Sequence, residues 1–230
     1  MPGESDALNI LGLKYRYPAA DTRSAKPGWV VDVASLALKP GEQMLLTGGS
    51  GRGKSTLLYL TAGLMEPAEG EVRVAGASVG ALHGAARDLF RGRHIGMIFQ
   101  TFNLLQGFSA AENVMAALMF TELPPREHRV KAESLLRHLG IERFDAEPER
   151  MSVGQQQRIA VARAVACDPV LVLADEPTAS LDPENAAAAM DLIQSICREK
   201  NAALLCVSHD PTMASRFSRR ASLDDLRDRT

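Results

Sequence analysis

The sequence has few cysteines and lacks a long apolar run. Its three cysteines, at positions 167, 197 and 206, are odd in number and widely separated. They predict reduced core residues of a cytosolic protein rather than a disulfide framework or a metal site. No run of about 18 consecutive apolar residues occurs, so we expect a chain that does not itself span a bilayer. The N-terminus has no basic region followed by an apolar stretch, so no signal peptide is predicted.

A large excess of charge of one sign is also lacking. The formal net charge at pH 7 is −2, so no nucleic-acid partner held by electrostatics is expected. The 230 residues are 46% hydrophobic and 23% charged, as in one globular domain with a substantial core. No internal repeat, low-complexity segment or long heptad insertion interrupts the chain. The sequence therefore predicts a single domain.

What the sequence does contain is a phosphate-binding loop pattern. Residues 48–55 read G-G-S-G-R-G-K-S and match G-x-x-x-x-G-K-[ST] without a mismatch. The apolar run 43–47 predicts a buried strand before the loop, and residues 56–60 predict the first turns of a helix after it. This arrangement gathers backbone N–H groups around one point, which suits a polyphosphate. Kinases, GTPases and transport ATPases all use such a loop, so the loop alone does not indicate what happens to the nucleotide. Lys54 would contact the β- and γ-phosphates, and the Ser55 hydroxyl would ligate Mg²⁺. The expected nucleotide-binding residues of this segment are Gly48, Gly49, Ser50, Gly51, Arg52, Gly53, Lys54, Ser55 and Thr56.

The order of the predicted elements indicates an α/β fold. Apolar segments at 8–17, 30–38 and 43–47, separated by Pro and Gly turns, predict antiparallel strands, and residues 70–75 add another. From about residue 101 to 166, apolar residues recur at three- and four-residue spacing, which predicts helices. Strand–helix alternation on both sides of this block implies a parallel α/β core with an inserted helical subdomain.

Individual elements follow from the same patterns. Helices are expected at 110–120, 126–139 and 152–166, and buried strands at 95–100, 170–173 and 202–207. Asp182 and Pro183 predict the N-cap and first turn of a further helix that runs towards Lys200. We expect the nucleotide-binding core and its β subdomain to occupy about residues 1–100 and 167–230, and the helical subdomain to occupy about 101–166.

Polar residues follow the buried strands at their C-terminal ends, the edge at which α/β sheets bind ligands. Asp175 would hold Mg²⁺ directly or through water, and Glu176 would deprotonate a water for attack on the γ-phosphorus. His209 would hydrogen-bond the γ-phosphate, and Gln100 would join the Mg²⁺ shell. Taken alone, an acidic pair or a histidine at a strand end is more often a simple turn or surface residue. The phosphate loop upstream favours the catalytic interpretation.

With these motifs the chain resembles the ATP-binding subunits of ABC transporters over nearly its whole length. The matching segments are the phosphate loop at 48–56, the glutamine loop at 99–100, the signature stretch M-S-V-G-Q-Q-Q-R at 151–158, the second carboxylate motif at 171–177, the D-loop at 180–182 and the switch histidine His209. They stand in the order and spacing of the family. The resemblance implies a RecA-like P-loop NTPase core with an N-terminal antiparallel β subdomain and an inserted α-helical subdomain. It also implies ATP hydrolysis coupled to transport.

The resemblance further implies a head-to-tail dimer, in which ATP on one phosphate loop is covered by the signature helix of a second copy. Ser152, Gly154 and Gln155 would then face the γ-phosphate with the N–H groups of that helix, and Asp182 would also belong to the nucleotide site. Closing and opening of the dimer would move a separate integral-membrane permease subunit. Such a subunit would work at the cytoplasmic face of the cell membrane.

Two segments point to a subgroup of the family. Residues 98–105 (I-F-Q-T-F-N-L-L) and 112–114 (E-N-V) are most similar to the subgroup that serves lipoprotein release, macrolide-type export and cell division. The leading hypothesis is an ATPase that powers export or lipoprotein extraction. The alternative is a regulatory or scaffold ABC ATPase, of the cell-division or cell-wall control type, that clamps a membrane partner without transport. Phe102, Leu104 and Leu105 fit core packing and a docking groove for the permease equally well.

Three features depart from the family pattern. One is a short tail after His209, with S-L-D-D-L at 222–226 where a final strand and turn usually lie. Val153 stands where the signature usually has Gly, and its β-branched side chain restricts the backbone and adds bulk beside the phosphate. Tyr17 is the ring expected to stack on adenine. The segment 18–28 is longer than usual, so Tyr15 and Trp29 remain competitors for that role.

Overall fold

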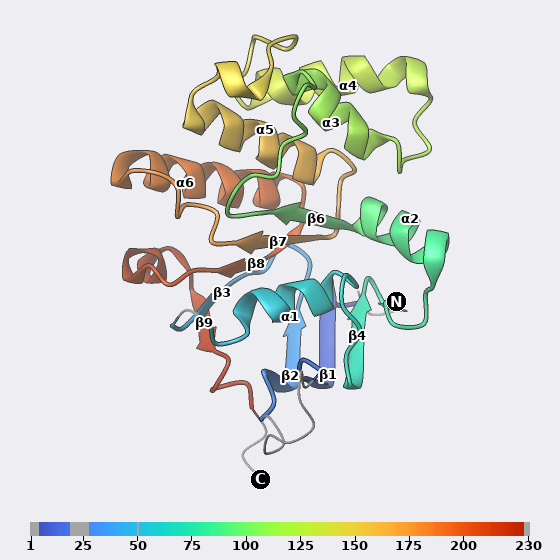
Figure 1. The fold of residues 1–230 in the computed structure, drawn as a ribbon, viewed down its shortest axis with the longest axis vertical. Coiled ribbons are helices and arrows are strands. Elements are labelled where there is room, and N and C mark those ends of the chain that lie inside the picture. The colour runs from blue at the N-terminus through green and yellow to red at the C-terminus, as the bar shows by residue number, and fades with distance from the viewer. Residues whose placement is uncertain (1–4, 19–27, 50, 228–230) are drawn as a thin grey trace.

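The structure, a computed structural model, describes residues 5–18, 28–49 and 51–227. Figure 1 shows three layers: helices at the top, a central sheet, and an antiparallel sheet below it. The central sheet has the strand order β6-β7-β8-β3-β9, and every pairing in it is parallel. The lower sheet has the order β2-β1-β4-β5 and is antiparallel. The predicted α/β fold with an N-terminal antiparallel subdomain is confirmed.

The antiparallel sheet consists of β1 (Leu8–Tyr15), β2 (Val31–Leu38), β4 (Glu69–Val74) and β5 (Ala77–Ser78). Alternate residues face the core in these strands, as expected for a sheet with one solvated face. In β1 the buried residues are Leu8, Ile10 and Leu13, so the spacing changes from two to three. Gly12 lies at that change with a φ of 57°, where the register with β4 shifts. A bulge with glycine in the left-handed region accounts for the extra residue.

The parallel sheet consists of β3 (Gln43–Thr47), β6 (Ile95–Ile98), β7 (Leu171–Asp175), β8 (Ala203–Val207) and β9 (Arg219–Ser222). The prediction that residues 43–47 form a third antiparallel strand is wrong, because β3 pairs in parallel with β8 and β9. Its three central residues are all buried, which is typical of a parallel strand covered on both faces. The edge strand β9 was not predicted, since its residues are mostly polar.

The helices are α1 (Lys54–Thr61), α2 (Gly84–His94), α3 (Ala110–Leu118), α4 (Pro125–His138), α5 (Val153–Val165) and α6 (Pro183–Glu199), with short 3-10 turns η1 (Pro148–Arg150) and η2 (Pro211–Arg216). The three helices predicted between 110 and 166 are present, each within two residues of its predicted ends. Ser109 and Ser152 begin α3 and α5 with capping boxes, and the Asp182 side chain caps α6 as predicted.

The parallel sheet separates two hydrophobic cores, and alternate residues of its strands point to each. In β7, Val172 and Ala174 pack with helices α3 to α6, whereas Leu171 and Leu173 pack with α1 and the antiparallel sheet. The helices of residues 110–165 therefore reach the sheet through α5, which contacts both β6 and α6. This layering leaves the C-terminal ends of β3, β7 and β8 at one edge of the molecule. In the described part of the chain, the helices are too short or too polar to cross a bilayer.

Candidate nucleotide-binding site

The phosphate loop connects β3 to α1 and depends on glycine at defined positions. Gly48, Gly51 and Gly53 all have positive φ angles, of 134°, 75° and 87°. A Cβ atom at Gly53 would lie 2.4 Å from the carbonyl oxygen of Val30, so a side chain at this position is excluded as well as strained. Ser50 lies outside the described residues. The turn delivers the N-terminus of α1, with its free N–H groups, to the edge of the sheet.

Lys54 is held inside this loop. Its side chain is buried, and the ammonium Nζ donates to the carbonyl oxygens of Gly48 at 2.7 Å and Gly49 at 2.9 Å. These carbonyls fix the ammonium group above the loop, beside the N–H groups that begin α1. A bound polyphosphate would bring stronger, charged acceptors to the same donor.

Ser55 and Asp175 meet at the same edge from different elements. Ser55 lies in the first turn of α1, and Asp175 is the last residue of β7. The Ser55 hydroxyl donates a hydrogen bond of 3.0 Å to Asp175 Oδ1. Burial raises the pKa of the Asp175 carboxyl and the charge of Glu176 raises it further, against the hydrogen bond from Ser55 and the charge of Lys54. A buried carboxylate with a raised pKa is a site that a cation would stabilise.

This pair fits Mg²⁺. A hydroxyl and a carboxylate oxygen are hard ligands of the kind that Mg²⁺ takes, and it usually completes its shell with phosphate oxygens and water. Within the described residues, no cluster of three or more His, Cys, Asp or Glu side chains could hold a metal by itself. The arrangement therefore suits a metal that arrives with a nucleotide better than one bound by protein ligands alone.

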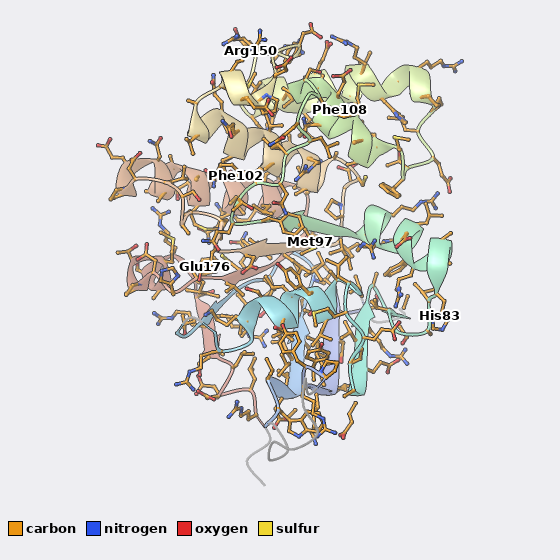
Figure 2. All side chains as sticks on the ribbon, viewed as in Figure 1. His83, Met97, Phe102, Phe108, Arg150 and Glu176 are labelled. Atoms are coloured by element: carbon orange, nitrogen blue, oxygen red, sulfur yellow. The ribbon has the colours of Figure 1, made fainter. Side chains whose placement is uncertain are left out.

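Glu176 and His209 form a hydrogen-bonded pair beside the phosphate loop. His209 Nδ1 lies 2.8 Å from Glu176 Oε1, and the backbone N–H of His209 donates to Glu176 Oε2 at 3.3 Å. The two residues follow adjacent strands, β7 and β8, which explains why they meet. In Figure 2, Glu176 is at the left end of the sheet, where these strands finish.

Ten of the predicted residues line one cavity of about 480 Å³. Gln100, Glu176 and His209 face it from the ends of three strands, together with the phosphate loop and Tyr17. Gln100 itself lies two residues beyond the end of β6, so the predicted strand 95–100 is shorter than expected. The cavity also contains two residues that the sequence analysis missed, Val30 and Val207. The convergence of these groups makes this edge the candidate nucleotide site.

Of the three candidate rings, Tyr17 lies at the phosphate-loop cavity. Tyr17 lines the cavity, is 51% exposed, and its hydroxyl lies 3.0 Å from the Thr56 hydroxyl. Tyr15 packs edge-on against Tyr17 with ring centroids 5.2 Å apart and does not line the cavity. Trp29 is covered by the guanidinium of Arg16, 4.9 Å from its ring centroid. Only Tyr17, of these three, thus presents a ring to the phosphate-loop cavity.

Gly48 and Gly49 do not line the cavity, and four further predicted nucleotide-binding residues lie on other elements. Ser152, Gly154 and Gln155 form the start of α5, where the Ser152 hydroxyl accepts from the N–H of Gln155 at 3.3 Å. The Asp182 carboxylate accepts from the side chain and backbone of Asn185, and these hydrogen bonds hold the pKa of Asp182 below its usual value. Within one chain, these four residues do not face the phosphate loop.

One half-buried cation that the sequence analysis did not single out joins α5 to the segment after Gln100. Arg163 donates to the carbonyl oxygens of Phe102 at 2.7 Å and Asn103 at 2.6 Å. Both of these residues have positive φ angles, 59° and 48°, a conformation that is strained for non-glycine residues. Burial lowers the pKa of Arg163. The guanidinium therefore stabilises a strained turn between β6 and the helices.

An apolar groove of about 380 Å³ lies beside this turn, between α2, β6, α3 and α5. Leu64, Leu105 and Phe120 line it and are 47%, 39% and 39% exposed. Phe102, which Figure 2 places between the sheet and the helices, is only 6% exposed and belongs to the core. Core packing therefore describes Phe102, which is buried, and Leu104, which packs against the core. Leu105 instead lines the groove.

Comparisons with known proteins agree with this geometry. The ABC transporter family model matches residues 31–179. The chain is 40% identical to the lipoprotein-releasing system ATP-binding protein LolD of Chromohalobacter salexigens over 199 residues, covering 86% of this chain and 84% of that protein. It is 41% identical to LolD 1 of Rhodospirillum rubrum over 195 residues, covering 84% and 86%.

Solved structures give the same result. The dimeric ATP-binding cassette MJ0796 bound to ADP and Pi superposes with a TM-score of 0.82 at 30% identity, covering 97% of each chain. A second dimeric structure of MJ0796, a bacterial ABC transporter cassette, superposes with a TM-score of 0.81 at 30% identity, covering 94% of this chain and 93% of that one.

Proposed function

This chain belongs to the ABC transporter family, and we propose that it is the ATP-hydrolysing subunit of a complex that releases lipoproteins or exports a related cargo. The observation that carries the proposal is the single cavity shared by the phosphate loop, Gln100, Glu176 and His209. The similarity to LolD proteins favours the export interpretation over a regulatory scaffold that clamps a membrane partner without transport.

ATP would bind with its ring on Tyr17 and its phosphates over the start of α1. Lys54 would exchange its bonds to the loop carbonyls for bonds to the β- and γ-phosphates. Ser55 and Asp175 would hold Mg²⁺, and Gln100 would join its coordination shell. When bound, the ion would neutralise part of the phosphate charge. The phosphate loop thus fixes the nucleotide before any chemistry occurs.

Glu176 would act as the general base. Its carboxylate accepts the proton of a water molecule whose oxygen attacks the γ-phosphorus, while the bond from that phosphorus to the bridging oxygen of ADP breaks. His209, now bonded to Glu176, would donate a hydrogen bond to the γ-phosphate when ATP is present. The pair would then hold the water and the phosphate in line.

A second copy of the chain would supply the missing wall of the site. Ser152, Gly154 and Gln155 are at the N-terminus of α5, where free N–H groups suit an anion. Since they do not face the phosphate loop of their own chain, we place them, with Asp182, over the nucleotide of a partner copy. The relatives whose structures are dimeric cassettes support this arrangement.

The permease would dock in the apolar groove lined by Leu64, Leu105 and Phe120. This groove adjoins the turn held by Arg163, so a movement of residues 101–166 against the core would reach a docked partner. We accordingly divide the chain into a core at about 1–100 and 167–230 and a helical subdomain at about 101–166. The working place of such a complex is the cytoplasmic face of the inner membrane.

Replacing the proposed base tests this function. Glu176→Gln removes the proton acceptor, so we expect ATP turnover to fall by at least about 100-fold while ATP affinity stays within about threefold. Steady-state hydrolysis and binding of a fluorescent ATP analogue measure the two quantities. Glu149→Gln, on the exposed turn η1, is the matched control and should leave both unchanged. Normal turnover in Glu176→Gln would contradict the proposed role of Glu176.

A further inference from the structure

Gln157 is a buried amide near the start of α5, the helix whose N-terminus is proposed to cover the nucleotide of the partner copy. Its side chain is 2% exposed, and Nε2 donates to the carbonyl oxygen of Pro177 at 2.8 Å. Pro177 directly follows the proposed base, Glu176. One side chain thus connects the second turn of α5 to the loop that carries the base of the same chain.

That loop is strained and needs such anchors. Glu176 has a φ of 47°, the left-handed region, and it precedes a proline, which restricts its backbone further. A strained conformation at a catalytic residue persists only where surrounding contacts fix it. Here the Glu176 N–H donates to Val207 O at 3.0 Å, and its carbonyl accepts from Ala179 at 3.1 Å. The hydrogen bond from Gln157 fixes the carbonyl group of Pro177, the next residue in the chain.

We propose that Gln157 is a positioning residue that couples the two ATP sites of the dimer. It holds Glu176 of its own chain in place, while the N-terminus of the same helix contacts the nucleotide on the partner copy. A displacement of α5 on dimer closure is therefore transmitted within one chain to the base of the other site. The proposal rests on the proposed function, because the coupling requires the head-to-tail dimer.

A neighbouring glutamine provides a matched control. Gln156 is on the same turn of α5, but its Nε2 donates to Met151 O at 3.1 Å, at the start of its own helix. The two residues share side-chain chemistry and are adjacent in the helix, but Gln156 is half-buried and bonds a different segment. Replacement of either by methionine keeps a side chain of similar size and removes the donor.

The first measurement is steady-state kinetics of the purified complex. In Gln157→Met we expect kcat to fall about tenfold while KM for ATP changes less than about twofold, since the base is misplaced and the phosphate loop is intact. Gln156→Met should change neither constant by more than about twofold. A Gln157→Met complex that keeps the wild-type kcat would overturn the proposal.

Mixed dimers separate positioning from packing. Two differently tagged chains are co-expressed with the membrane partner, and complexes that carry both tags are isolated. Glu176→Gln in one chain silences one site. In the first arrangement Gln157→Met is in the other chain, and in the second arrangement it is in the same chain as Glu176→Gln. We expect the tenfold loss only when Gln157→Met is in the chain that retains Glu176.

If Gln157 served only to support α5, the loss would instead appear in the second arrangement, because its working site takes α5 from the altered chain. A loss in the second arrangement, alone or equal to that in the first, would therefore overturn the positioning role and leave the proposed function intact. Full activity of the complex with Glu176→Gln in both chains would overturn the proposed base, and this inference with it.

Discussion

The two halves of the proposed ATP site are built differently. The phosphate-loop half is assembled within one chain: Lys54 is 5% exposed and already bonded, and Ser55 lies 3.0 Å from Asp175. The signature half lies at the surface, with Val153 47% exposed and the Ser152 hydroxyl bonded only to its own helix. One chain therefore carries the catalytic groups but leaves one wall of the site open. The difference predicts separable effects: changes to the phosphate-contacting residues of the first half lower ATP affinity, and changes in the second half lower turnover without changing the ATP affinity of the single chain.

The largest effect should come from the phosphate-loop half. Lys54→Ala removes the buried ammonium that would contact the phosphates, so we expect ATP affinity to fall about 100-fold, as charge-assisted hydrogen bonds allow. Isothermal titration with ATP and Mg²⁺ measures it. Lys39→Ala, at an exposed lysine before β3, should leave affinity unchanged. Equal affinity in both variants would show that the phosphate loop does not hold the nucleotide.

An intermediate effect should come from Ser152. Ser152→Ala removes an N-cap and the hydroxyl proposed to contact the partner's nucleotide, so turnover should fall about tenfold while ATP affinity of the single chain stays constant. Ser109→Ala is the matched control, because Ser109 caps α3 with the same capping box. Both variants should lose about 1 kcal/mol of unfolding free energy, and only Ser152→Ala should lose turnover. Parallel losses of turnover would remove Ser152 from the site.

The smallest effect should come from Val153, the residue that departs from the family pattern. Its exposed side chain would be partly buried against a second copy. Val153→Gly removes that apolar surface and should weaken ATP-dependent dimerisation by about threefold, with ATP affinity unchanged. Glycine in place of valine should also lower the unfolding free energy by about 0.5 kcal/mol. Analytical ultracentrifugation with ATP measures the first quantity, and tighter dimers in the variant would contradict the account.

The sequence predicted the elements whose signals are local. The phosphate loop and the cap at Asp182 each follow from a few neighbouring residues, and the structure contains both, with Ser50 outside the described residues. The orientation of β3 was mispredicted, because an apolar run of five residues does not state which strands it pairs with. The edge strand β9 was missed because its residues are mostly polar.

Long-range polar contacts were also beyond the sequence patterns. Arg163 and Gln157 each bond backbone carbonyls of distant segments, 60 and 20 positions away. Gln157 gave one available signal: it begins the buried stripe that continues with Ala160, Val161 and Ala164 on α5. A polar residue in an apolar stripe indicates a buried hydrogen bond, although the pattern does not identify its partner.

The most direct test of the account is the mass of the Glu176→Gln chain in solution with ATP, measured by light scattering after size exclusion. Because this variant should bind ATP without cleaving it, we predict a species of twice the 24.8 kDa of one chain, and a single-chain mass with ADP. Adding Ser152→Ala should return the ATP-bound sample to the single-chain mass. A single-chain mass of Glu176→Gln at saturating ATP and Mg²⁺ would contradict the claim that a second copy completes the site.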